Sequence, residues 1–278
     1  MMSPGQEAFV RIVKALGPYR NELVFVGAWC HRLLQFHPLA AAPTFEPLMT
    51  EDADVATPDR LPSRTPTLDQ ALTAGGFKAR LSGDGKLPVT KYYLEGGENG
   101  LYIEFVAQLQ GGEYTRSREP NDILGVSGVT AQKLRHVDLL LFEPWELELS
   151  EHRGFDVGTD AIVVRVATPT SYLVQKVLTL RKRRTAAKQS KDALYIHDTL
   201  TLFGSSLTAL REQAARVLDQ LASRTQRELH ELRVALFQDK ALMIGAERTA
   251  GATGRANPPS ADTIAAVCTV GLEQIFAP

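Results

Sequence analysis

The alternation of apolar and polar residues predicts a helix, a strand, a tight turn and a second helix at the start of the chain. Ser3-Pro4-Gly5-Gln6 has the residue types of a capping box, with proline at the first helical position. Apolar residues then follow at helical spacing as far as Leu16. Residues 22–26 form an apolar run that leads into Gly27-Ala28, so we expect a buried strand whose turn starts a short helix.

Three further strands are predicted where short apolar runs are bounded by glycine-rich segments. They cover residues 77–81, 89–94 and 101–108. The segments between them, residues 82–85 and 96–100, are typical of hairpin turns, which predicts antiparallel pairing. Before these strands, Thr67-Leu68-Asp69-Gln70 is a second capping box, and Gly75-Gly76 marks the end of the helix that it starts.

The second half of the chain has mainly helical periodicity. Two apolar runs, residues 137–142 and 161–167, come before it, and we expect both to be strands. Thr168-Pro169 then begins the first of several helices. Helical spacing covers residues 169–184, 190–203, 206–222 and 224–241. Residues 251–259 are rich in glycine and proline, which predicts a flexible linker before a last helix near residues 261–276.

The composition is that of an ordinary globular protein and excludes a general affinity for polyanions. With 278 residues the chain is long enough for two domains, and we expect an α+β domain over residues 1–160 and a mainly helical domain over residues 161–278. The net charge of -1 gives no overall attraction to nucleic acid or to membranes. The start lacks the pattern of a signal peptide, and no apolar run reaches the roughly 18 residues of a membrane span. We expect a cytoplasmic protein.

Two carboxylates two positions apart, Asp52 and Asp54, are the first candidates for catalytic chemistry. In a strand, residues i and i+2 project to the same face, so both carboxylates would point to one spot while Val55 is buried. Carboxylate oxygens are preferred ligands of Mg²⁺, which proteins often bind together with the phosphates of a nucleotide. The alternative is a solvated acidic turn without a ligand.

A third carboxylate, Glu104, is flanked by apolar residues in the predicted strand 101–108. If this strand lies beside the one that carries Asp52, three carboxylates converge. Two divalent cations, typically about 3.5–4 Å apart, could then bind the attacking and leaving oxygens of a phosphoryl displacement. The alternative for Glu104 is a strand residue that faces solvent.

The order of these features resembles the DNA polymerase β-like nucleotidyltransferase superfamily. Within it, the chain is similar to bacterial nucleotidyltransferase-fold proteins related to abortive-infection nucleotidyltransferase toxins. The resemblance rests on the Gly27-Ala28 turn, Thr50-x-Asp52-x-Asp54, Glu104 in an apolar strand, Thr168-Pro169, Tyr172-Leu173-Val174-Gln175-Lys176 and Lys191-Asp192. It implies a mixed sheet with flanking helices, followed by a helical domain.

The resemblance also implies a reaction, in which a nucleoside monophosphate moves from a nucleoside triphosphate (NTP) to an acceptor hydroxyl. Asp52, Asp54 and Glu104 would hold Mg²⁺ or Mn²⁺ and serve as the catalytic residues. The residues implied at the nucleotide are Gly27, Ala28, Thr50, Lys176 and Lys191. The acceptor is unknown, with RNA and protein as candidates.

Other interpretations of these residues stay open. Gly27 suits any strand-to-helix turn, and Lys176 and Lys191 suit the solvated face of a helix. A second hypothesis is a nucleotide-binding or regulatory module without turnover, which the alanine at Ala28 and the apolar Leu48 favour. A third is a toxin-like enzyme that acts on transfer RNA. Its basis is a basic cluster: Arg181, Lys182, Arg183, Arg184, Lys188 and Lys191. The alternative is a solubilising face, which the absence of interleaved aromatic residues for base stacking favours.

Overall fold

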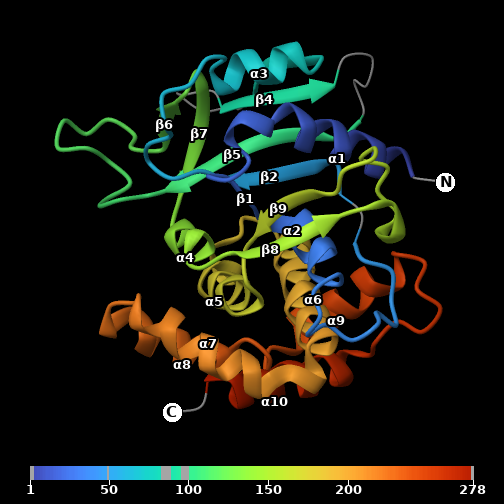
Figure 1. Ribbon diagram of the computed structural model, residues 1–278. Coiled ribbons are helices and arrows are strands. Elements are labelled where there is room, and N and C mark those ends of the chain that lie inside the picture. The colour runs from blue at the N-terminus through green and yellow to red at the C-terminus, as the bar shows by residue number, and fades with distance from the viewer. Residues whose placement is uncertain (1–2, 49, 83–88, 95–99, 277–278) are drawn as a thin grey trace. The chain divides into compact units, whose positions relative to one another are not determined.

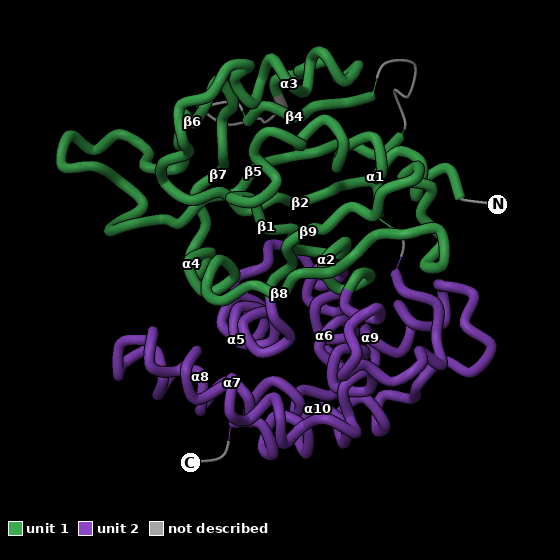
Figure 2. Tube along the Cα trace, in the orientation of Figure 1, with its two compact units in different colours: residues 1–33, 49–167 green, residues 34–48, 168–278 purple. Residues whose placement is uncertain are grey.

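The computed structural model describes residues 3–48, 50–82, 89–94 and 100–276. The chain divides into two compact units (Figure 2). Unit 1 consists of residues 1–33 and 49–167, and unit 2 of residues 34–48 and 168–278. The chain therefore leaves unit 1 after residue 33, returns at residue 49 to complete the sheet, and leaves again after residue 167.

Unit 1 is built on a mixed sheet, in which the described residues form nine strands (Figure 1). The strands are β1 (Val24–Phe25), β2 (Asp52–Ala56), β3 (Phe77–Ser82), β4 (Val89–Leu94), β5 (Tyr102–Gln108), β6 (Ile123–Val126), β7 (Val129–Leu134), β8 (Trp145–Leu149) and β9 (Ile162–Val166). The main order is β3-β4-β5-β2-β1-β9-β8, and β7 pairs with both β5 and β6. Parallel pairing of β2 with β5 places two strands of distant sequence side by side at the centre.

Helices α1 (Pro4–Ala15) and α3 (Leu68–Ala74) lie on one face of this sheet. Phe9 of α1 stacks on Trp29 at 3.9 Å between ring centroids and also contacts Phe25 of β1. On β4, the Tyr92 hydroxyl donates a hydrogen bond to Asp69 of α3. The side chains of β2 and β5 that point to this face are fully buried. The side chains between them along each strand point to the opposite face of the sheet.

Unit 2 is helical. Its helices are α5 (Pro169–Thr179), α6 (Ala186–Leu202), α7 (Leu207–Asp219), α8 (Ser223–Ala235), α9 (Lys240–Gly251) and α10 (Ala261–Phe276). Helix α10 packs against α6, α7 and α9 within this unit. No helix in the described ranges of the chain combines the length and apolar character that crossing a lipid bilayer requires.

Both capping boxes predicted from the sequence are confirmed. Ser3 and Gln6 cap α1 reciprocally, and Thr67 and Gln70 do the same for α3. The predicted strands at 77–81, 89–94 and 101–108 are β3, β4 and β5, and the predicted antiparallel pairing of β3 with β4 and of β4 with β5 is confirmed. The turns assigned to residues 82–85 and 96–100 fall mainly on segments 83–88 and 95–99, outside the described residues.

The strand predicted for residues 137–142 is wrong, because Val137–Leu141 forms the short helix α4. The backbone N–H groups of Val137 and Asp138 both donate to Oε1 of Gln108, at 2.9 Å and 3.2 Å. A side chain from β5 thus satisfies the first donors of the helix, a contact that local apolar periodicity does not reveal. The element that follows α4 in the chain is strand β8, which the sequence did not predict.

The single helical stretch predicted for residues 224–241 is also wrong. It consists of α8 and the start of α9, with a break at residues 236–239. The Asp239 carboxylate accepts hydrogen bonds from the N–H groups of Ala241 and Leu242, so it caps a new helix. Strands β6 and β7 were likewise not predicted from the sequence.

Candidate functional site

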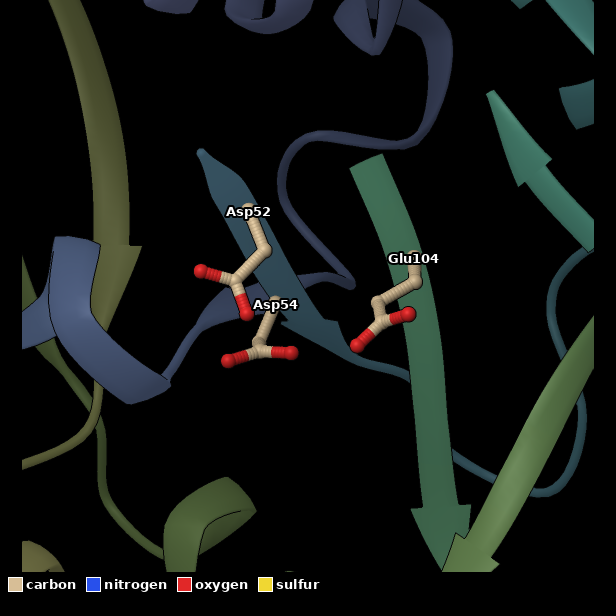
Figure 3. A group of neighbouring side chains, drawn as sticks. All are labelled: Asp52, Asp54 and Glu104. Atoms are coloured by element: carbon tan, nitrogen blue, oxygen red, sulfur yellow. The ribbon is translucent and has the colours of Figure 1, made fainter. Parts of the chain in front are cut away.

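Asp52, Asp54 and Glu104 converge on the face of the sheet opposite α1 and α3 (Figure 3). Asp54 of β2 is paired in register with Glu104 of β5, and Asp52 lies two residues earlier on β2. One carboxylate oxygen from each residue lies within 4.8 Å of the others. Each side chain is partly exposed, while Ala53 and Val55 between them are buried. The structure therefore brings together the three carboxylates that the sequence singled out.

Gly27 begins helix α2 (Gly27–Leu34) directly beside Asp54. Its φ of +61° lies in the left-handed region, and a Cβ at this position would overlap Oδ2 of Asp54 and lie 3.0 Å from Cγ. The N–H of Val26 also donates to the backbone oxygen of Asp54 at 2.9 Å. Glycine is thus required here by the close approach of a carboxylate, and the first turn of α2 lies at the acidic site.

Thr50 and Ala28 are the next residues that the resemblance implies at the nucleotide. The Thr50 hydroxyl donates a hydrogen bond to Oδ1 of Asp52, which orients that carboxylate. Ala28 is buried in the first turn of α2 and follows Gly27 directly. Thr50 therefore contacts the triad directly, and Ala28 is one residue from Gly27, which lies beside Asp54.

Lys91 of β4 adds a positive charge next to the triad. Its Nζ lies 3.3 Å from Oε2 of Glu104 and donates a hydrogen bond to the Tyr102 hydroxyl at 3.0 Å. Burial lowers the pKa of Lys91, but the hydrogen bond to Tyr102 and the charge of Glu104 outweigh it and raise the pKa above its ordinary value. Lys91 is therefore charged at neutral pH and holds one side of the Glu104 carboxylate.

The three carboxylates suit a hard divalent cation. They offer only oxygen ligands, and their partial exposure leaves room for the water molecules that Mg²⁺ retains. Negative charges this close repel one another, and a divalent cation between them would offset that repulsion. The donor set therefore fits a hard divalent cation.

A scan against protein families matches residues 6–219 to a family described as nucleotidyltransferase. This chain belongs to that nucleotidyltransferase family. Among solved structures it is similar to an antigenic nucleotidyltransferase-like protein from Paracoccidioides brasiliensis, with 17% sequence identity and a TM-score of 0.40. That match covers 73% of this chain and 78% of the other. No curated protein matches the sequence at a significant level.

In unit 2 of this nucleotidyltransferase, Lys176 is buried in an ion-pair cluster. Its Nζ lies 2.5 Å from Oδ1 of Asp192, and Nε of Arg183 lies 2.6 Å from Oδ2 of the same carboxylate. The ring centroids of Tyr172 and Tyr195 lie 5.4 Å and 5.1 Å from the Lys176 ammonium. The solvated-lysine interpretation of Lys176 is therefore wrong, because the side chain is 5% exposed.

This cluster predicts a specific loss of stability in acid. Burial alone would raise the pKa of Asp192, but the charges of Lys176 and Arg183 outweigh it and hold the pKa below its ordinary value of 3.8. Asp192 thus stabilises the fold above that value, and its contribution falls as pH drops towards the folded pKa. The stability advantage of the wild type over Asp192→Asn should be constant above about pH 5 and shrink below it, by up to about 1.4 kcal/mol per pH unit. Urea unfolding from pH 3 to 7 tests this, and a difference independent of pH would contradict it.

The other basic residues of unit 2 are partly engaged in ion pairs. Lys182 lies 3.5 Å from Glu228, and Arg183 is bonded to Asp192. Lys191 is half-buried, with its ammonium 5.7 Å from the centroid of the Tyr195 ring. At least two members of the basic cluster thus serve contacts within the unit, which weakens its interpretation as an RNA-binding face.

The sequence did not predict Lys91 and Tyr102 as site residues. Burial is the main reason that the pKa of Tyr102 lies above its ordinary value, with the hydrogen bond from Lys91 acting against it and the charges of Glu104 and Asp52 adding to it. The phenol is therefore neutral at physiological pH. The signal that could have found Lys91 is the alternation in Val89-Thr90-Lys91-Tyr92-Tyr93-Leu94, and Tyr102 lies two residues before Glu104 on the same strand face.

We predict that Gly27→Ala weakens metal binding at the triad. The added methyl group would push the Asp54 carboxylate away, and the left-handed backbone would cost roughly 1–2 kcal/mol of stability. Mn²⁺ affinity, measured by titration calorimetry, should fall by about tenfold or more, which corresponds to the loss of roughly 1.4 kcal/mol. Gly17→Ala is the matched control, since a Cβ there meets no atom within 4 Å. Unchanged Mn²⁺ affinity in folded Gly27→Ala would show that the position of the Asp54 carboxylate does not determine metal binding.

Proposed function

We propose that this chain is a metal-dependent nucleotidyltransferase that moves a nucleoside monophosphate from an NTP to an acceptor hydroxyl and releases pyrophosphate. The observation that carries the proposal is the convergence of Asp52, Asp54 and Glu104 beside the first turn of α2. Membership of the nucleotidyltransferase family supplies the reaction class. The ion is Mg²⁺, or Mn²⁺ in its place, and the substrate is an NTP.

In the proposed reaction the acceptor oxygen attacks the α-phosphorus of the NTP. The bond between that phosphorus and the oxygen that bridges to the β-phosphate breaks, and pyrophosphate leaves. Asp52 and Asp54 would hold the divalent ions, which when bound stabilise the negative charge of the attacking and leaving oxygens. Glu104 would accept the hydroxyl proton of the acceptor, since it lies at the edge of the triad towards β4.

The triphosphate is proposed to lie at the start of α2. The first N–H groups of a helix lack intrahelical partners and favour bound phosphate, and Gly27 lets a ligand approach the backbone. Ala28 would contribute its backbone N–H, and Thr50 would orient Asp52. Lys176 is bonded to Asp192 of α6 within unit 2, and a role of Lys176 or Lys191 at a phosphate stays a prediction.

The test is transfer of label from each α-³²P-labelled NTP with Mg²⁺ or Mn²⁺, with total RNA and the protein itself offered as acceptors. Labelled product together with pyrophosphate would support the proposal. Nucleotide binding without label transfer to either acceptor would instead favour the binding or regulatory module. Hydrolysis at the γ-phosphate would contradict the proposal, because the reacting atom would then be the γ-phosphorus and not the α-phosphorus.

A further inference from the structure

The triad continues across the sheet into a strip of cationic and aromatic side chains on the same face. On β5, Tyr102 is paired with Asp52 of β2, while Glu104 is paired with Asp54. Antiparallel register with β4 then places Lys91 opposite Glu104 and Tyr93 opposite Tyr102. On β3, Arg80 lies opposite Lys91, and Lys78 lies opposite Tyr93. We call these five residues the β3–β5 strip: Lys78, Arg80, Lys91, Tyr93 and Tyr102.

Rings and cations contact one another along the β3–β5 strip. The Tyr93 and Tyr102 ring centroids lie 5.0 Å apart, with an angle of 36° between the planes. The Arg80 guanidinium lies 5.2 Å from the Tyr93 ring centroid, and the Lys91 ammonium lies 4.3 Å from that of Tyr102. Lys78 and Arg80 are exposed, and the other three side chains are partly exposed. The strip therefore combines aromatic rings and positive charge on one face of the sheet.

The strip leads away from the triad across neighbouring strands of the sheet. From β5 to β3 it spans two strand spacings, or about 10 Å at roughly 4.8 Å each. It begins at Glu104, the residue proposed to activate the acceptor, and runs away from Gly27, beside which the triphosphate is proposed to bind. Its place on the sheet is therefore the acceptor side of the triad.

We propose that the β3–β5 strip binds the 3′ end of a single-stranded polynucleotide and directs its terminal hydroxyl to Glu104. Unpaired bases stack on aromatic side chains whatever their identity, and cations neutralise the backbone phosphates between them. The strip supplies both kinds of side chain within one patch. This inference rests on the proposed function, because it names the acceptor of that reaction.

Binding can be tested apart from catalysis. A fluorescein-labelled single-stranded RNA of mixed sequence is titrated with the protein in EDTA and without NTP, and anisotropy is recorded at several salt concentrations. Tyr93→Leu should weaken binding by about tenfold through lost stacking. Arg80→Gln should weaken it and reduce the slope of log affinity against log salt by about 0.7. The second variant keeps the test decisive if Tyr93→Leu fails to fold.

Two residues of the loop between β5 and β6 provide matched controls. Tyr114 is 66% exposed, and Arg116 is exposed, so Tyr114→Leu and Arg116→Gln remove the same groups elsewhere on unit 1. Both controls should bind RNA as the wild type does.

Three outcomes would overturn the inference. They are wild-type RNA affinity in both Tyr93→Leu and Arg80→Gln, equal affinity for an RNA duplex of the same charge, and label transfer to protein alone without RNA binding. Failure of the proposed function has a different signature. RNA binding that depends on Tyr93 and Arg80, without label transfer under any condition, would support the proposed role of the strip and contradict the proposed transfer reaction.

Discussion

Asp54→Asn is expected to lower nucleotide transfer by about 10³-fold or more without unfolding the protein. Asp54 is the residue of the triad that contacts both Gly27 at the start of α2 and, through strand register, Glu104. Asparagine keeps the shape of the side chain but removes the charge that a divalent cation requires. Loss of several kcal/mol of charge stabilisation in the transition state corresponds to a rate effect of this size.

The measurement pairs transfer kinetics with Mn²⁺ binding. Asp54→Asn should lose both together, and its unfolding midpoint in urea should stay near that of the wild type. Asp160→Asn is the control, since Asp160 is an exposed carboxylate of unit 1 in the loop before β9. Full transfer activity in Asp54→Asn would remove the triad from the mechanism, and loss of activity in both variants would show that the effect is not specific.

The core of the candidate site could be predicted because its signals are local. Alternation along β2 places Asp52 and Asp54 on one face, and apolar neighbours mark Glu104 as a strand residue. A glycine after a short apolar run predicts the turn at Gly27. The reason for that glycine, overlap with the Asp54 carboxylate, could not be predicted, because it depends on how β1 and β2 pair.

Other features depend on contacts between distant parts of the chain. Lys91 reaches Glu104 only through the register of β4 with β5, which the residues between these strands do not specify. Helix α4 depends on Gln108, a side chain from another element. The linker predicted at residues 251–259 contains no helix beyond Gly251, but Arg255 within it is buried, which a composition rich in glycine and proline does not reveal.

Asp198→Ala is expected to lower the free energy of unfolding by about 3–5 kcal/mol, because it leaves the buried guanidinium of Arg255 without its counter-charge. The two nitrogens Nη1 and Nη2 of Arg255 lie 2.9 Å and 2.5 Å from the two oxygens of Asp198. The side chains are 2% and 0% exposed. Together with burial, the Asp198 charge also raises the pKa of the Cys268 thiol well above its ordinary value, which places α10 beside the same carboxylate.

Two comparisons decide whether the buried charge is the cause. Glu228→Ala removes one partner of an exposed ion pair with Lys182, and it should cost about 1 kcal/mol or less. The double variant Asp198→Leu/Arg255→Met replaces both charges by apolar groups and should recover most of the lost stability, because no charge is then left buried. Urea unfolding followed by circular dichroism measures all three. A double variant as unstable as Asp198→Ala would mean that packing around α6, and not the uncompensated charge of Arg255, determines the loss.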